Sequence, residues 1–191
     1  MKKLVKSNLL DAAIKLWFVT TLVGQWIFAF YVIIYHGSLI SSKGLKGMGE
    51  THMSNAYISG DFLGNIMLAI HLLTAVVIIM GGPLQLIPQI QFNFPRFHRW
   101  LGRSYLLFTF FGALVGLYLI WTRPINSFGS INQNIGISVE AILILVFGGI
   151  TLKYALARKI QIHKKWALRL FIVASGVWFL RIGYKFWFYI E

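Results

Sequence analysis

The sequence predicts an all-α protein: a polytopic membrane bundle of five transmembrane helices that forms a single integral membrane domain over residues 1–191. Of its residues, 58% are hydrophobic and only 12% are charged, whereas a soluble domain carries about a quarter charged residues. Five stretches are long and apolar enough for a membrane helix, which needs roughly 20 residues. None of them alternates with the period of two that a barrel strand requires.

The five predicted spans are separated by segments that hold most of the charges and turn residues. They cover residues 12–35, 62–87, 100–122, 134–157 and 167–189. The basic start of the chain resembles that of a signal peptide, but the first apolar run is about 20 residues long. No small-x-small cleavage site follows this run, so we expect a retained helix.

Two of the spans contain residues that affect helix shape or packing. In the second span, Pro83 follows Gly81 and Gly82, which predicts either a helix broken near a site or a plain bend before the next segment. In the third span, Gly112 and Gly116 have the spacing that permits close helix contact, and we expect them to pack within the bundle.

The positive charge predicts the orientation of the helices. The net charge is +13, from 18 Lys and Arg against five Asp and Glu. With the N-terminus inside and the C-terminus outside, eleven of the cations lie in inner segments and four in outer segments, while Lys15 and Lys153 lie near inner helix ends and Arg181 lies inside a span. We therefore expect a bacterial inner-membrane protein whose inner face meets anionic lipid headgroups, and no nucleic-acid partner.

Two segments at the predicted inner face are alike. Residues 97–103 and 162–169 each contain a His, then basic residues, then a Trp with an Arg three places after it. Each opens a predicted helix that runs from inside to outside. Spans 2–3 and 4–5 are therefore expected to be a tandem repeat of two hairpins. The alternative is that basic and aromatic residues recur at membrane interfaces without any repeat.

Four polar side chains within the spans form the predicted site, since such groups are costly in a bilayer. They are Gln25, His71, Glu140 and Arg181. Counting helical rise from the predicted outer ends places all four roughly 10–15 Å below the outer surface. One interpretation is an ion pair of Glu140 with Arg181, beside packing hydrogen bonds from Gln25 and His71. The other is a polar cavity, open to the outer face, that binds a ligand or relays protons.

Histidines are the candidate cofactor ligands, because a membrane heme b usually takes two of them on facing helices. His71 would pair with His52 or His36 if the outer loop folds inward, and His98 and His163 would share an inner site. Without a cofactor, His98 and His163 would contact headgroups and helix N-termini. A zinc site on His71 and Glu140 is a weaker alternative. The chain has no cysteine, which excludes thiolate metal sites and iron–sulfur clusters.

The basic residues nearest the inner face are expected to meet lipid phosphate. They are Arg99, Arg103, Lys164, Lys165 and Arg169. The same cluster would serve a membrane protein partner or a second copy of the chain.

One string of residues points to a family. The string is His98-Arg99-Trp100-Leu101-Gly102-Arg103-Ser104-Tyr105, and it occurs together with His71, Gly82-Pro83-Leu84-Gln85, the 163–169 cluster and Arg181. With these residues, the chain resembles an uncharacterised prokaryotic family of predicted multi-pass membrane proteins, catalogued as a domain of unknown function. The resemblance covers about residues 62–182. It implies a helical bundle in the inner membrane with recurring His and Arg residues, and relatives that continue beyond the position of Glu191.

These observations predict a membrane protein with an outer-half intramembrane polar site, interpreted as a redox component that binds heme b or a quinone. One alternative is a transporter or channel for a small ion or protons. Another is a non-catalytic assembly or lipid-binding subunit of a larger membrane complex. Hydrolysis of the soluble type is not expected, because the sequence shows no Ser/His/Asp constellation and no phosphate loop.

Overall fold

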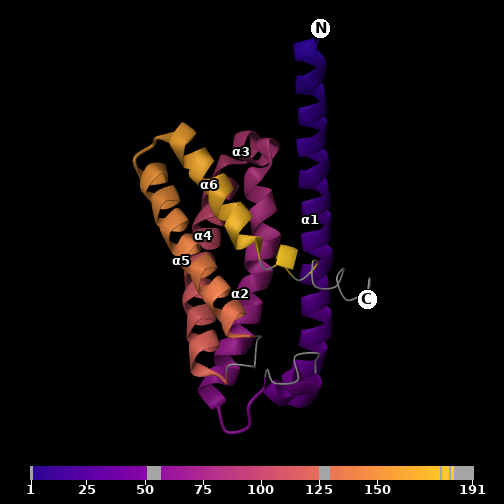
Figure 1. Cartoon of the computed structure of the whole chain (residues 1–191), viewed down its shortest axis with the longest axis vertical. Helices are drawn as coiled ribbons and strands as arrows, with labels where there is room; N and C mark the ends of the chain where they lie inside the picture. The colour runs from indigo at the N-terminus through magenta and orange to yellow at the C-terminus, as the bar shows by residue number, and fades with distance from the viewer. Residues whose placement is uncertain (1, 51–56, 125–129, 177, 181, 183–191) are drawn as a thin grey trace.

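The computed structural model describes residues 2–50, 57–124, 130–176, 178–180 and 182. Within them the chain is helical, as predicted, and the long helices run alternately up and down (Figure 1). In order, the elements are α1 (Lys2–Lys43), the 3-10 helix η1 (Gly44–Glu50), α2 (Phe62–Leu86), α3 (Pro88–Asn93), α4 (Pro95–Thr122), α5 (Ile131–Leu156) and α6 (Ile160–Ala174). Beyond α6, residues 176, 178–180 and 182 are also helical.

Four of these helices are long and apolar enough to cross a membrane. They comprise Asn8–Met48, Phe62–Leu86, Pro95–Thr122 and Ile131–Leu156. The expected fifth span, 167–189, begins within α6 and continues into residues 183–189, which lie outside the described residues. The fifth span therefore stays a prediction.

Helix α1 stands at one side of the bundle and runs past the other helices at its N-terminal end (Figure 1). Its 42 residues, at about 1.5 Å each, make a rod of about 63 Å, twice the thickness of a hydrocarbon core of about 30 Å. The predicted span 12–35 is only the apolar middle of this helix. Beyond it, the helix is continued by residues whose hydroxyls, such as Ser38 and Ser42, donate to carbonyls one turn earlier.

Local sequence sets where the other helices begin and end. Asp61 caps α2 by accepting a hydrogen bond from the Gly64 amide at 2.9 Å. The helix continues through Pro83, which is buried, and stops at Leu86. Ile87 precedes Pro88 and is extended (φ −73°, ψ 115°), as expected of a residue before proline. The Gly81–Pro83 run therefore does not end α2, which continues for one more turn.

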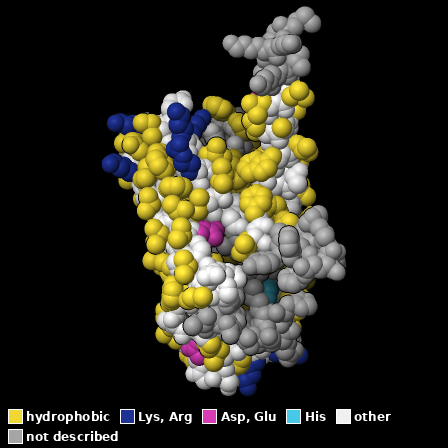
Figure 2. Space-filling model, in the orientation of Figure 1, with side chains coloured by type: hydrophobic (Ala, Val, Ile, Leu, Met, Phe, Trp, Pro, Cys, Tyr) yellow, Lys and Arg dark blue, Asp and Glu magenta, His cyan; other side chains and the backbone are white. Residues whose placement is uncertain are grey.

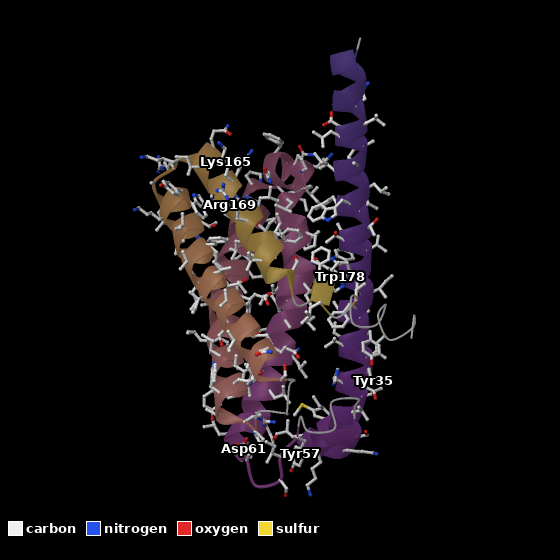
Figure 3. The ribbon with its side chains drawn as sticks, in the orientation of Figure 1. Tyr35, Tyr57, Asp61, Lys165, Arg169 and Trp178 are labelled. Atoms are coloured by element: carbon white, nitrogen blue, oxygen red, sulfur yellow. The ribbon has the colours of Figure 1, made fainter. Side chains whose placement is uncertain are left out.

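The three expected inner segments lie at one end of the molecule. These are the N-terminus of the chain, the α2–α3–α4 junction and the α5–α6 junction (Figure 1). Lys and Arg side chains gather where α5 turns into α6, while hydrophobic side chains cover much of the flank (Figure 2). We call this end the basic end and the opposite one the Asp61 end, where Figure 3 labels that residue. The orientation in the membrane and the hairpin repeat stay predictions.

Glycines let the helices approach each other closely. A β-carbon at Gly112 would lie 3.3 Å from Thr74 Oγ1, and one at Gly116 would lie 3.2 Å from His71 Cε1, so the GxxxG face of α4 packs on α2. On α5, a β-carbon at Gly148 would lie 2.9 Å from the Phe110 ring of α4. The expectation that the glycines of span 3 pack within the bundle agrees with these contacts.

Candidate functional site

A cavity of about 420 Å³ lies among α1, α2, α4, α5 and the chain just after α6. Its volume falls in the range of about 300–1,000 Å³ that is usual for small-molecule sites. Most of the lining is aliphatic or aromatic. Side chains able to form hydrogen bonds interrupt this surface; they include Tyr31, His36, His71, Thr74, Thr109, Gln133 and Glu140. The cavity is therefore suited to a ligand with an apolar body and a polar head.

His71 lines the cavity from the middle of α2, half-buried against α4. Its ring packs tightly against position 116, since a β-carbon there would lie 3.2 Å from Cε1. One turn later, the Thr74 hydroxyl donates to the His71 carbonyl at 2.8 Å. Gly116 thus allows an imidazole to lie at the α2–α4 interface and still face the cavity.

Glu140 lines the cavity from α5, and its carboxylate lies close to the backbone that follows α6. A β-carbon at Gly176 would come 2.6 Å from Glu140 Oε1. The glycine at position 176 is therefore what lets the chain pass beside this carboxylate. The structure brings Glu140 and His71 to one cavity from two different helices.

Gln25 does not line the cavity. It is 1% exposed, and its Nε2 donates to the Ser175 hydroxyl at 2.8 Å, which joins α1 to the end of α6. Next to it, the Trp178 indole packs on Gly24, and Figure 3 shows Trp178 beside α1. The geometry of Gln25 is that of a packing hydrogen bond between helices.

Two residues of the expected site lie outside the described residues. Arg181 is one of them, so its pairing with Glu140 stays a prediction. His52, one of the two histidines considered as a partner of His71, is the other. The second of those histidines, His36, belongs to α1 and lines the cavity together with His71.

His98 and His163 lie near the basic end and do not line the cavity. His163 Nδ1 is 3.0 Å from the Thr151 carbonyl of α5, and His98 lies within electrostatic range of His163 and Lys164. Among the described residues there is no group of three or more His, Asp or Glu side chains placed to hold a metal ion. The two histidines are thus neighbours in a region separate from the cavity.

The basic cluster is exposed at the same end. Figure 3 shows Lys165 and Arg169 on α6. The Lys164 ammonium lies 5.9 Å from the centre of the Phe92 ring, and the Arg169 guanidinium lies 4.6 Å from the centre of the Trp166 ring. Arg99 and Arg103 are exposed on the first turns of α4. These aromatic contacts hold the cations at the surface, where headgroups would lie.

Sequence reasoning missed a buried cation at the Asp61 end. The Arg123 side chain is 1% exposed, donates to Asn65 Oδ1 at 2.8 Å, and lies 3.4 Å from Asp61 Oδ2. Burial lowers the pKa of Arg123, and the charge of Asp61 opposes that shift. This contact ties the start of α2 to the end of α4. The available signal was an acidic residue at the start of one span and an arginine directly after the next.

Comparison with known proteins gives one family. The family model described as "Predicted membrane protein (DUF2306)" matches residues 68–190, which include most of α2 and all of α3 to α6. No curated protein and no solved structure matches the chain.

Proposed function

Because the chain belongs to the family described as "Predicted membrane protein (DUF2306)", with several apolar helices consistent with a multi-pass location, we propose from its cavity that it binds a lipophilic quinone within the membrane. The ring of the quinone would lie between His71 and Glu140. Its isoprenoid chain would lie along the aliphatic lining.

The observation that carries this proposal is the composition of the cavity wall. Leu72, Val76, Ile79, Ile137 and Ile144 supply an apolar surface from α2 and α5. A ligand confined to such a surface gains from burial of its own apolar area, by about 25 cal/mol per Å². A wall that is apolar with a few convergent polar groups is typical of sites for small molecules and cofactors.

His71 and Glu140 suit the two carbonyl oxygens of a quinone ring. A neutral imidazole donates one N–H, and a protonated carboxyl donates one O–H, so each would hydrogen-bond one ring oxygen. Both groups also exchange protons, and a quinone takes up two protons when it is reduced to a quinol. His71 and Glu140 are therefore placed to bind the ring and to supply protons to it.

Binding of decylubiquinone to the protein in lipid nanodiscs tests the proposal. The His71→Leu and Glu140→Leu variants should each weaken binding by roughly 2- to 10-fold, because a hydrogen bond between neutral groups contributes about 0.5–1.5 kcal/mol. His163→Leu makes the same chemical change outside the cavity and should bind as the wild type does. The proposal is disproved if the wild-type protein fails to bind the quinone. It is also disproved if His71→Leu and Glu140→Leu both bind the quinone as tightly as the wild type does.

A second candidate rests on His36 and His71, which line the same cavity from α1 and α2. Two imidazoles from adjacent helices are the ligands that a membrane heme b uses. Protein purified from heme-supplied cells should then show a Soret band that is lost in His36→Ala and in His71→Ala. A wild type without this band excludes heme. Small-ion transport, a role in assembly and the bacterial inner membrane as location stay predictions from the sequence.

A further inference from the structure

A second row of polar side chains lies on α4 between the basic end and the cavity. It comprises His98, Tyr105 and Thr109, with Gly102 between the first two. The intervals of four, three and four residues place all of them on one face of the helix. Thr109 lines the cavity, whereas Tyr105 and His98 lie one and three turns further toward the basic end.

This face of α4 packs against small and polar residues of α2. A β-carbon at Gly102 would lie 3.0 Å from Gln85 Oε1, and one at Gly82 would lie 3.1 Å from Tyr105 Cε2. Gln85 therefore lies beside the helix turn that separates His98 from Tyr105. The α2–α4 interface is thus polar over this stretch, although both helices are apolar enough to span a membrane.

Several buried polar atoms at this interface lack a protein partner within the described part of the chain, although the Thr109 hydroxyl donates to the Tyr105 carbonyl at 2.6 Å. Gln85 Nε2, His98 Nδ1 and the Tyr105 hydroxyl are buried, and within the described residues none of them has a hydrogen-bond partner. Tyr105 is only 7% exposed; its hydroxyl lies toward the Thr109 side chain without the geometry of a hydrogen bond. A buried polar group without a hydrogen-bond partner is destabilising, and ordered water is the usual partner for such groups.

The row and the cavity together extend along most of the bundle. From His98 to Thr109 is eleven residues, or about 16 Å along the helix axis. From Thr109 the cavity continues past His71 to Gln133, in the first turn of α5 at the Asp61 end. Polar side chains are thus present from the basic end of α4 to the opposite end of α5.

We infer that the α2–α4 interface is a proton route, in which His98, Gln85, Tyr105 and bound water connect the basic end of the bundle to the cavity at Thr109. His98 accepts a proton from water at the basic end and releases it to water held by Gln85. The Tyr105 hydroxyl accepts that proton on oxygen and donates its own to water beside the Thr109 hydroxyl in the cavity. Glu140 or His71 accepts the proton and releases one to water beside Gln133 at the Asp61 end, so each group gains one proton and loses one, without electron transfer. The route rests on the proposed function only for its proton acceptor, which is Glu140 or His71 in the cavity.

Proton flux into vesicles tests the route. The full-length protein is reconstituted in phosphatidylcholine–phosphatidylglycerol vesicles that contain a pH-sensitive dye, and a potassium diffusion potential set with valinomycin drives proton entry. Wild-type vesicles should acidify faster than protein-free vesicles. Tyr105→Phe should lower this protein-dependent flux by roughly 100-fold, the low end of what a positioned proton-transfer group contributes.

Two further variants make the result specific. Tyr118→Phe removes the same hydroxyl from the same helix at an exposed position outside the cavity lining and should leave the flux unchanged. Thr109→Val keeps the side-chain shape and removes the hydroxyl, so it should lower the proton flux as well. If Tyr105→Phe does not fold, Thr109→Val is the variant that tests the route. Wild-type flux equal to that of protein-free vesicles overturns the route. Proton flux that stays at the wild-type level in Thr109→Val and in a folded Tyr105→Phe also overturns the route.

Quinone binding, measured on the same preparations, separates the two proposals. A protein that binds decylubiquinone and conducts no protons refutes the route alone. A protein that conducts protons through Tyr105 and binds no quinone refutes the proposed function alone.

Discussion

Trp178 lies directly on Gly24, so that a β-carbon at position 24 would come 2.5 Å from Trp178 Cζ2. The residues on either side of this contact matter to the cavity, because Trp178 lines it and α1 forms one of its walls. The Gln25–Ser175 hydrogen bond of 2.8 Å reinforces the same joint. The size of the cavity therefore depends on how closely the end of α6 approaches α1.

Gly24→Leu should separate the end of α6 from α1. A leucine side chain cannot share space with the Trp178 ring, and overpacking of this kind costs typically about 1–3 kcal/mol. We expect a lower unfolding temperature in detergent and weaker quinone binding. Gly37→Leu is the matched control, since a β-carbon at that position of α1 meets nothing within 4 Å. Equal unfolding temperatures for the two variants would contradict the contact.

Ser175→Ala should destabilise the protein modestly. It leaves the buried Gln25 amide without its acceptor, and hydrogen bonds between membrane helices contribute about 0.6 kcal/mol on average and up to about 1.7 kcal/mol. A double-mutant cycle with Gln25→Leu measures the coupling, since the second change should cost little once the first is made. Additive effects of the two substitutions would show that the hydrogen bond contributes nothing.

Arg123→Leu should lower stability by about 1–3 kcal/mol, because it removes the charged donor to Asn65 and the ion pair with Asp61. Thermal unfolding of the purified protein is the measurement. Arg96→Leu removes an exposed cation at the opposite end and should change stability by less than about 0.5 kcal/mol. If Arg96→Leu is as costly as Arg123→Leu, loss of positive charge, rather than loss of these contacts, is responsible.

Gly116→Leu should abolish ligand binding while the bundle stays assembled. The new side chain would occupy the space of the His71 ring and displace it within the cavity. Gly149→Leu introduces the same side chain on α5 where nothing lies within 4 Å, and it should bind as the wild type does. Binding retained by Gly116→Leu would mean that the ligand does not use His71.

Hydropathy predicted both ends of α2 closely, the starts of α4 and α5 less closely, and the ends of α1 poorly. The span predicted as 62–87 is the helix Phe62–Leu86, because apolar composition, the Asp61 cap and Pro88 all coincide there. In α1 the apolar run covers only the middle, whereas segments containing Lys, Leu and Ser continue the helix at both ends. Helix propensity does not require an apolar face, so hydropathy alone underestimates such a helix.

The sequence predicts a common level for the candidate site residues, but it does not predict the direction in which each side chain points. Counting residues from the helix ends placed Gln25, His71 and Glu140 at a similar level, and the structure shows the last two in one cavity. Gln25 instead bonds Ser175, because the rotation of a helix depends on its neighbours. The spacing of His98, Tyr105 and Thr109 is visible in the sequence. That His98 Nδ1 and the Tyr105 hydroxyl lack a hydrogen-bond partner within the described residues depends on which α2 residues face them.

The wall that α1 contributes to the cavity would affect which ligands different members of the family accept. The family match begins at residue 68, whereas Phe28, Tyr31, Val32 and His36 belong to a helix that precedes it. Chains that share the matched region and differ in this first helix would therefore enclose ligands of different shape. A chimera that exchanges only this first helix would then transfer ligand selectivity and leave His71 and Glu140 untouched.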